Sequence, residues 1–304
     1  MTQHDSPTAI SAYQEELTER IKRHATADGT HPTAIPELCL RRASTESEPL
    51  HTIHLPSLYL IAQGSKTAVL AGTSCRCDSS SYMVTSVHLP VIGRITGASP
   101  QIPYVSLQLT LHPDVLLDVV KHSPPPGSRE TGSGMLLNPS TPPLMEAIVR
   151  LVRLLDTPAD IPMLSPLIIR EIFYRVLQDE QGASLRQFAV IGSCAQGISQ
   201  AIHRINRDYS MPLNISELAK EVSMSATSLH KHFKKVTAMS PLQYQKVIRL
   251  QAARRLLLTE GLDAAAAGFR VGYESPSQFS REYARFFGRP PMRDVKLLRD
   301  SSLI

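Results

Sequence analysis

The sequence predicts an α+β protein with a β-rich part toward the N-terminus and an all-helical part at the C-terminus. Between residues 36 and 111, short runs with alternating apolar positions are separated by turn residues such as Gly64, Gly72 and Gly93. This pattern is typical of an antiparallel sandwich or a small barrel. From residue 198 onward the apolar residues follow helical spacing, and one helical pattern occurs twice.

Length and composition indicate an ordinary globular protein. At 304 residues the chain exceeds one typical core, so we expect two domains. No apolar run approaches the roughly 18 residues that a membrane helix needs, and the first 30 residues lack the apolar centre of a signal peptide. The four cysteines show no disulfide spacing. We therefore expect a cytoplasmic protein.

Changes in composition divide the chain into four segments. We expect a polar N-terminal segment at 1–35, a β-rich domain with helices at 36–190, a linker at 191–197 and a helical domain at 198–304. Within the β-rich domain, helices are predicted at 113–122, 141–156 and 165–180, and a Pro/Gly-rich loop at 123–134. The helix at 141–156 has an apolar stripe that is either core or a dimer surface: Leu144, Ile148, Leu151, Val152 and Leu155.

Charge is distributed unevenly. Residues 197–304 hold 17 Lys and Arg against 9 Asp and Glu, a net charge of +8, whereas the other residues hold 15 against 18, a net charge of −3. A basic module beside a mildly acidic one predicts a polyanionic partner for the basic module.

The helical part contains an internal repeat. SATSLHKHFKKVTAMSP (225–241) and SPSQFSREYARFFGRPP (275–291) agree in character at an offset of 50. A short helix precedes each copy, with a turn at Ser223 in the first and at Gly272 in the second. A short helix, a tight turn and a capped second helix form a helix-turn-helix motif, whose second helix presents its N-terminal half to DNA.

Helical periodicity divides each second helix into two faces. The inward residues are Leu229, Phe233 and Val236 in the first copy, and Phe279, Tyr283 and Phe286 in the second. Small and polar side chains followed by a cation suit a helix in the major groove, with Lys231 or Arg281 reaching guanine or phosphate. The predicted DNA-binding residues are Ala226, Thr227, His230, Lys231, Lys234, Ser277, Gln278, Ser280 and Arg281.

One long helix joins the two copies. It is predicted over 240–261, with Ser240 as its N-cap, Pro241 at its first position and Gly261 at its end. Twenty-two residues span about 33 Å, close to the ~34 Å of one turn of DNA. The chain is therefore expected to read a bipartite site in adjacent major grooves.

The helical part resembles the DNA-binding domain of AraC/XylS-family transcription regulators. The resemblance rests on MSPLQYQKVIRLQAARRLLL (239–258) and FRVGYESPSQFSREYARFFGRPP (269–291). It implies that both recognition helices enter the major groove, and that the regulator activates transcription with RNA polymerase, although repression is also open. Gly268 stands where the family usually has alanine, which is expected to weaken that helix by roughly 1 kcal/mol.

The β-rich part resembles the N-terminal domain of an AraC-type subgroup whose effectors are mostly undefined. The matching stretches include PSLYLIAQGSKTAVLAG (56–72) and YMVTSVHLPVIGRI (82–95). The resemblance implies a cupin-like β-barrel with helices that senses a small-molecule effector and forms a homodimer. It does not identify the effector or the pocket residues.

The sequence leaves three alternatives to this regulator. His51 and His54 could hold a metal, but residues three apart on a strand face opposite sides, so no metal or cofactor is expected. Cys75 and Cys77 share a strand face and could sense oxidants or electrophiles, although Arg76, the cation beside them, points to the other face. A cupin-like enzyme fused to a DNA-binding module is the third; hydrolase and nucleotide motifs are absent, and no enzyme is expected.

Overall fold

The computed structural model describes residues 6–122, 132–179, 182–190 and 192–300. The chain divides into two compact units, Met1–Gln196 with Lys235–Ala238, and Gly197–Lys234 with Met239–Ile304. The first contains the strands and the second is helical, so the α+β class and its order along the chain are confirmed. Most of the loop predicted at 123–134 lies outside the described residues.

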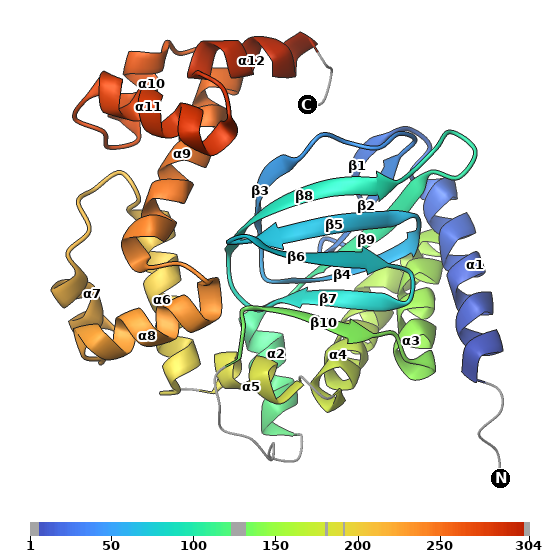
Figure 1. Cartoon of the computed structure of the whole chain (residues 1–304). Coiled ribbons are helices and arrows are strands. Elements are labelled where there is room, and N and C mark those ends of the chain that lie inside the picture. Colours follow the sequence, from blue (N-terminus) through green and yellow to red (C-terminus); the bar gives the residue numbers. More distant parts are fainter. Residues whose placement is uncertain (1–5, 123–131, 180–181, 191, 301–304) are drawn as a thin grey trace. The chain divides into compact units, whose positions relative to one another are not determined.

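The strands form two antiparallel sheets that face each other (Figure 1). The six-stranded sheet has the order β1-β2-β9-β4-β7-β10 and the four-stranded sheet has the order β3-β8-β5-β6. The strands of the first are β1 (Gly29–Pro32), β2 (Leu38–Ala43), β4 (Ser57–Gln63), β7 (Ser81–Thr85), β9 (Tyr104–Thr110) and β10 (Met135–Pro139). Those of the second are β3 (Leu50–His54), β5 (Ser65–Leu70), β6 (Thr73–Asp78) and β8 (Leu89–Gly97).

Most of the apolar runs in the sequence correspond to strands. The run at 82–93 divides into β7 and β8, because the chain crosses there from one sheet to the other. The short strands β1 and β10 were not predicted. Each lies at an edge of the larger sheet and carries a proline, which gives a weak strand signal.

Helices cover one face of the six-stranded sheet (Figure 1). They are α1 (Ser6–His24), α2 (Pro113–Lys121), α3 (Pro142–Arg153), α4 (Ile161–Gln178) and α5 (Gly182–Ala189), with short 3-10 turns at Leu154–Asp156 and Pro158–Asp160. Alternate strand residues such as Leu40 and Leu58 pack in one core with them. The whole predicted stripe from Leu144 to Leu155 is buried in this core.

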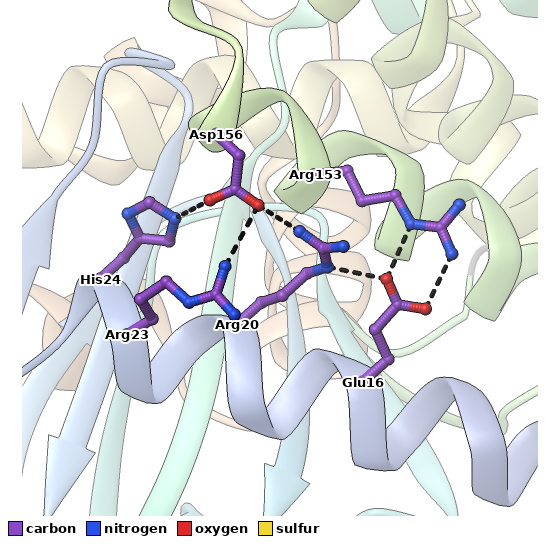
Figure 2. Close-up of polar contacts among 6 residues, drawn as sticks. All are labelled: Glu16, Arg20, Arg23, His24, Arg153 and Asp156. Carbon is purple, nitrogen blue, oxygen red and sulfur yellow. Dashed lines mark hydrogen bonds and ion pairs between the residues drawn. The ribbon is translucent and has the colours of Figure 1, made fainter.

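The N-terminal helix α1 is an integral part of the first unit, and the segment predicted at 1–35 is not a separate one. Leu17 and Ile21 are fully buried in the core. On the polar side of α1, Arg153 donates two hydrogen bonds of 2.7 Å to Glu16, and Asp156 accepts from Arg20 and His24 (Figure 2). Although burial opposes it, the hydrogen bonds from Arg153 lead in lowering the pKa of Glu16 to about 2.

The second unit consists of helices joined by short turns. They are α6 (Cys194–Arg207), α7 (Ile215–Glu221), α8 (Ala226–Thr237), α9 (Pro241–Thr259), α10 (Ala264–Arg270), α11 (Pro276–Phe287) and α12 (Pro291–Asp300). Because α6 begins at Cys194, the last four residues of the predicted linker are helical. No helix in the described ranges is both long enough and apolar enough to span a bilayer.

The connecting helix α9 begins where it was predicted and is shorter. Ser240 and Gln243 form a reciprocal capping box at its start. Gly261, beyond its end, has a φ of +64°, the left-handed conformation in which helices commonly stop. Its 19 residues span about 28 Å rather than the expected 33 Å, so its length alone does not match one turn of DNA.

Candidate nucleic-acid interface and an internal cavity

The two predicted helix-turn-helix turns have the same backbone geometry. Ser223 and Gly272 both adopt positive φ, +57° and +92°. In the first copy the N–H of Met224 donates to the carbonyl of Ala219, and in the second the N–H of Tyr273 donates to that of Gly268, at 2.8 and 3.0 Å. This six-residue closure is the Schellman helix ending. It directs the chain into α8 and α11 in the same way.

The recognition helices also start and stop alike. The Ser225 hydroxyl accepts the N–H of Ser228 at 3.2 Å, and the Ser275 hydroxyl accepts that of Gln278 at 3.3 Å. Ala238 and Gly288, 50 residues apart, follow the helices with positive φ. The repeat continues, because Pro241 and Pro291 begin α9 and α12. Helix α9 is thus the last helix of one repeat and the first of the next.

The inward residues are almost all confirmed. Leu229, Phe233, Val236, Phe279 and Tyr283 are fully buried, whereas Phe286 is only partly buried. Each of the two helices therefore has one buried face, and the opposite face is exposed.

The structure places the predicted DNA-binding residues on those opposite faces. All nine are exposed except Ser280, which is half-buried. Within the described part of the chain, no hydrogen bond or ion pair engages the side chains of Lys231, Lys234 and Arg281. Gln278 differs, because its amide donates to Glu282 one turn later at 3.4 Å. DNA contact by these residues remains a prediction, and the geometry leaves the cations free to make it.

Arg249, on α9, connects the two motifs and was not predicted. Its guanidinium donates to the carbonyls of Tyr209, Ser210 and Met211, which precede α7, at 2.7–3.2 Å. It also donates to the carbonyl of Gly272 in the second turn at 3.0 Å. One half-buried side chain thus joins the entry of the first motif to the turn of the second. The available sequence signal was an arginine on the face of α9 that also carries the buried Gln245.

Glu282 organises the second recognition helix and was also missed. It accepts from the Tyr273 hydroxyl at 2.9 Å and pairs with Lys246 of α9 at 3.4 Å. Burial opposes its ionisation, but hydrogen bonds from Tyr273 and Gln278 and the charge of Lys246 together hold the pKa of Glu282 below its usual value. The carboxylate therefore positions Gln278, which is a predicted base-contacting residue.

A cavity of about 270 Å³ lies in the first unit. Its walls come from both sheets and carry Arg41, Tyr59 and Ser106 on one side and His54 and Lys66 on the other. Sequence reasoning named no pocket residues, because these positions are brought together only by the strand order.

The structure bears on the candidate metal ligands and on the two neighbouring cysteines. Among the residues the structure describes, no group of three or more His, Cys, Asp or Glu side chains could hold a metal ion. The Sγ atoms of Cys75 and Cys77 lie 4.0 Å apart. The expectation that Arg76 is the cation beside them is wrong, because Lys66 pairs with Cys77 across β5 and β6 and acts electrostatically on both thiols.

Each of the two units matches the model of a known protein family. The model of the AraC-type transcriptional regulator N-terminus matches residues 34–184, and that of a helix-turn-helix domain matches 218–296. This chain belongs to the AraC/XylS family of transcriptional regulators. The second match includes both recognition helices, α8 and α11.

Individual relatives match this AraC-family chain over limited lengths. The HTH-type transcriptional regulator ArgR of Pseudomonas aeruginosa is 30% identical over 112 residues, 37% of this chain and 34% of that protein. The lactose operon transcription activator of Staphylococcus xylosus is 27% identical over 122 residues, 40% and 44% of the two chains. The chain thus spans less than half the length of these relatives.

Solved structures of ToxT from Vibrio cholerae share the fold over most of both chains. The unsaturated fatty acid-bound wild-type form has a TM-score of 0.55 at 13% identity, covering 85% of this chain and 94% of ToxT. An apo variant gives a TM-score of 0.54 at 13% identity, covering 86% and 98%. At this identity the likeness concerns the fold alone.

Proposed function

We propose that this protein is a sequence-specific DNA-binding transcription regulator whose two recognition helices, α8 and α11, contact adjacent major grooves. The observation that carries the proposal is the duplicated motif, with the same turn, the same serine cap and a free cation at the same position, Lys231 or Arg281. Helices of this kind read base edges from their N-terminal halves. The excess of basic residues in the same part of the chain supports binding to a polyanion.

In this proposal the first unit controls the second through a small-molecule effector and holds two copies together. The cavity between the sheets supports an effector role. A stripe on α4 supports a homodimer, because Met163, Leu167 and Tyr174 are 72%, 60% and 40% exposed at helical spacing. Activation through RNA polymerase is the output that the family resemblance implies.

The test is retention of fragmented genomic DNA by the purified full chain, with sequencing of the retained fragments. Wild type is expected to retain discrete sites with two half-sites about one turn apart. The Lys231→Glu/Arg281→Glu variant should lose them. An Arg255→Glu/Lys296→Glu variant, with the same change of charge at exposed positions outside α8 and α11, should keep them. Equal loss of retained DNA in both variants would show that net charge, and not the two recognition helices, accounts for the binding.

A second candidate trigger is modification of Cys75, favoured by its surroundings. A hydrogen bond from Cys77 leads in lowering the pKa of Cys75 to about 7, and the charge of Lys66 adds to it. A thiolate formed there would attack one oxygen of a peroxide, breaking the O–O bond to leave a sulfenic acid and hydroxide. If this is the trigger, replacing both cysteines by serine leaves DNA binding intact and abolishes the response to peroxide; an unchanged response excludes it.

A further inference from the structure

The cavity in the first unit is built from the inner faces of both sheets. Residues paired across neighbouring antiparallel strands point to the same face. In the larger sheet Arg41 pairs with Ser106, and in the smaller sheet Lys66 pairs with Ile95. All four residues line the cavity, so two cations from opposite sheets border the same space.

Among the residues that the structure describes, no acidic side chain lines this cavity. In the described ranges, neither Arg41 nor Lys66 forms an ion pair or a side-chain hydrogen bond. Burial, followed by the charge of Arg41, lowers the pKa of Lys66 to about 8. A partly buried cation without a counterion is costly to maintain, and its cost is offset when an anion binds beside it.

Gly93 makes room for the lysine. A Cβ atom at this position would lie 2.5 Å from Lys66 Cε and 2.9 Å from its Nζ. Such distances are far shorter than an ordinary contact between non-bonded atoms. The Lys66 side chain therefore lies directly over the Gly93 backbone, and the glycine sets where the ammonium group sits.

His54 adds a neutral polar group to the same wall. It is 5% exposed, and its Nδ1 is buried with no hydrogen-bond partner in the described ranges. Burial, with the charges of Lys66 and Arg41, lowers the pKa of His54 to about 3, so the ring is neutral near pH 7. Its ring lies 4.7 Å from that of Tyr59, another lining residue. A buried polar atom without a partner is uncommon in a native structure and fits a site that a polar ligand completes.

We propose that this cavity binds a compact organic carboxylate, with Lys66 and Arg41 holding the carboxylate group and the apolar side chains of Leu50 and Ile95 holding its body. This inference rests on the proposed effector control and specifies the chemical class of the effector. The cavity is slightly smaller than the usual range of about 300–1,000 Å³ for small-molecule sites, which favours a short or single-ring acid over a long chain.

The probes are hexanoate and phenylacetate, each with its neutral amide as a matched control. Calorimetry and thermal unfolding of the full chain are expected to show binding of at least one acid and none of its amide. Lys66→Met and Arg41→Met should each weaken binding tenfold or more, whereas Lys66→Arg should retain it. Lys121→Met, which removes an exposed lysine of the same unit, should have no effect.

Gly93→Ala provides a variant in which both cations remain and only the lysine is displaced; we expect a loss of acid binding comparable to that of Lys66→Met. Cys75→Ser/Cys77→Ser should not weaken binding, because neither cysteine lines the cavity. Failure of both acids to bind, equal binding of acid and amide, or full affinity in Lys66→Met overturns the inference.

DNA retention, measured on the same preparations, separates this failure from that of the proposed function. Specific DNA retention without acid binding removes the carboxylate site and leaves the regulator. Acid binding without specific DNA retention supports the site and contradicts the regulator.

Discussion

The two helix-turn-helix motifs share a backbone but fill their cores differently. Where the first has the buried residues Ala219 and Leu229, the second has Gly268 and Phe279. A Cβ on Gly268 would lie only 3.0–3.2 Å from atoms of the Phe279 side chain. The smaller residue therefore accommodates the larger ring, and this packing stands against the helix-propensity cost that glycine is predicted to have at position 268.

The polar interactions beneath the recognition helices differ as well. In the first motif, Tyr244 exchanges hydrogen bonds with Asn206, both uncharged. At the matching position of the second, Asp294 is 2% exposed. It accepts two hydrogen bonds from Arg254 at 2.8 and 2.9 Å and another from Tyr283. The two copies thus share their turns and caps, while the buried polar interactions differ between them.

The outward faces complete the contrast. In the described part of the chain, Lys231 and Lys234 of the first motif have no side-chain partners, whereas in the second Glu282 binds Gln278 and Lys246. Where Glu282 stands, the first motif has His232. We infer that the first motif contributes mainly adaptable cations and the second a more rigidly positioned surface.

The largest effect is expected when the buried ion pair is broken. Arg254→Met leaves Asp294 buried without its charge partner and should lower the free energy of unfolding by about 3 kcal/mol. Denaturant unfolding of the full chain, followed by the fluorescence of tyrosines, measures the loss. Arg255→Met removes the neighbouring exposed arginine and should change stability by less than about 0.5 kcal/mol. Equal losses would mean that the pair is not what distinguishes the second core.

Removing Arg249 tests whether the motifs act as one body. Arg249→Met removes charge-assisted hydrogen bonds to four carbonyls and should cost about 2 kcal/mol. It should also let the protein tolerate operators whose half-site spacing is changed by one base pair. Binding measurements on such operators, with Arg255→Met as control, decide the point; unchanged spacing preference would show that α9 alone sets the geometry.

Gly268→Ala tests the compensation between the two cores. Overpacking against a fully buried ring outweighs the gain in helix propensity, so we expect a net loss of about 1 kcal/mol. Combining it with Phe279→Leu gives the second motif the alanine and leucine that the first has at the matching positions, and the double variant should be more stable than the sum of the single changes predicts. Strict additivity of the two changes contradicts the compensation.

The smallest effect concerns pH. Because the pKa of Glu282 is lowered in the folded state, its stabilisation is present above the ordinary value of 4.5 and is lost as the pH falls below it. Glu282→Gln should therefore reduce the drop in stability between pH 7 and pH 4 by about 0.5 kcal/mol. Glu274→Gln, at an exposed position, should leave that drop unchanged. If Glu282→Gln also leaves the drop unchanged, the carboxylate does not stabilise the second motif.

The success of the sequence predictions followed the range of the interactions. Turns, caps and inward faces depend on neighbours a few residues apart, so the predictions for Ser223, Ser240 and Phe233 were correct. Arg249 and Glu282 act on residues far away along the chain, and their roles depend on tertiary packing. The cavity could not be predicted from the sequence for the same reason, since Arg41 and Lys66 come from two different sheets and are brought to one cavity only by the fold.

Sharing α9 between the two repeats restricts how this chain can change over evolution. Adding one residue to its middle would turn the second motif by about 100° and move it about 1.5 Å along the axis, while Arg249 could no longer reach both of its attachment points. Loops elsewhere can lengthen at little cost. Helix α9 cannot, and we expect homologues that recognise differently spaced operators to differ outside it.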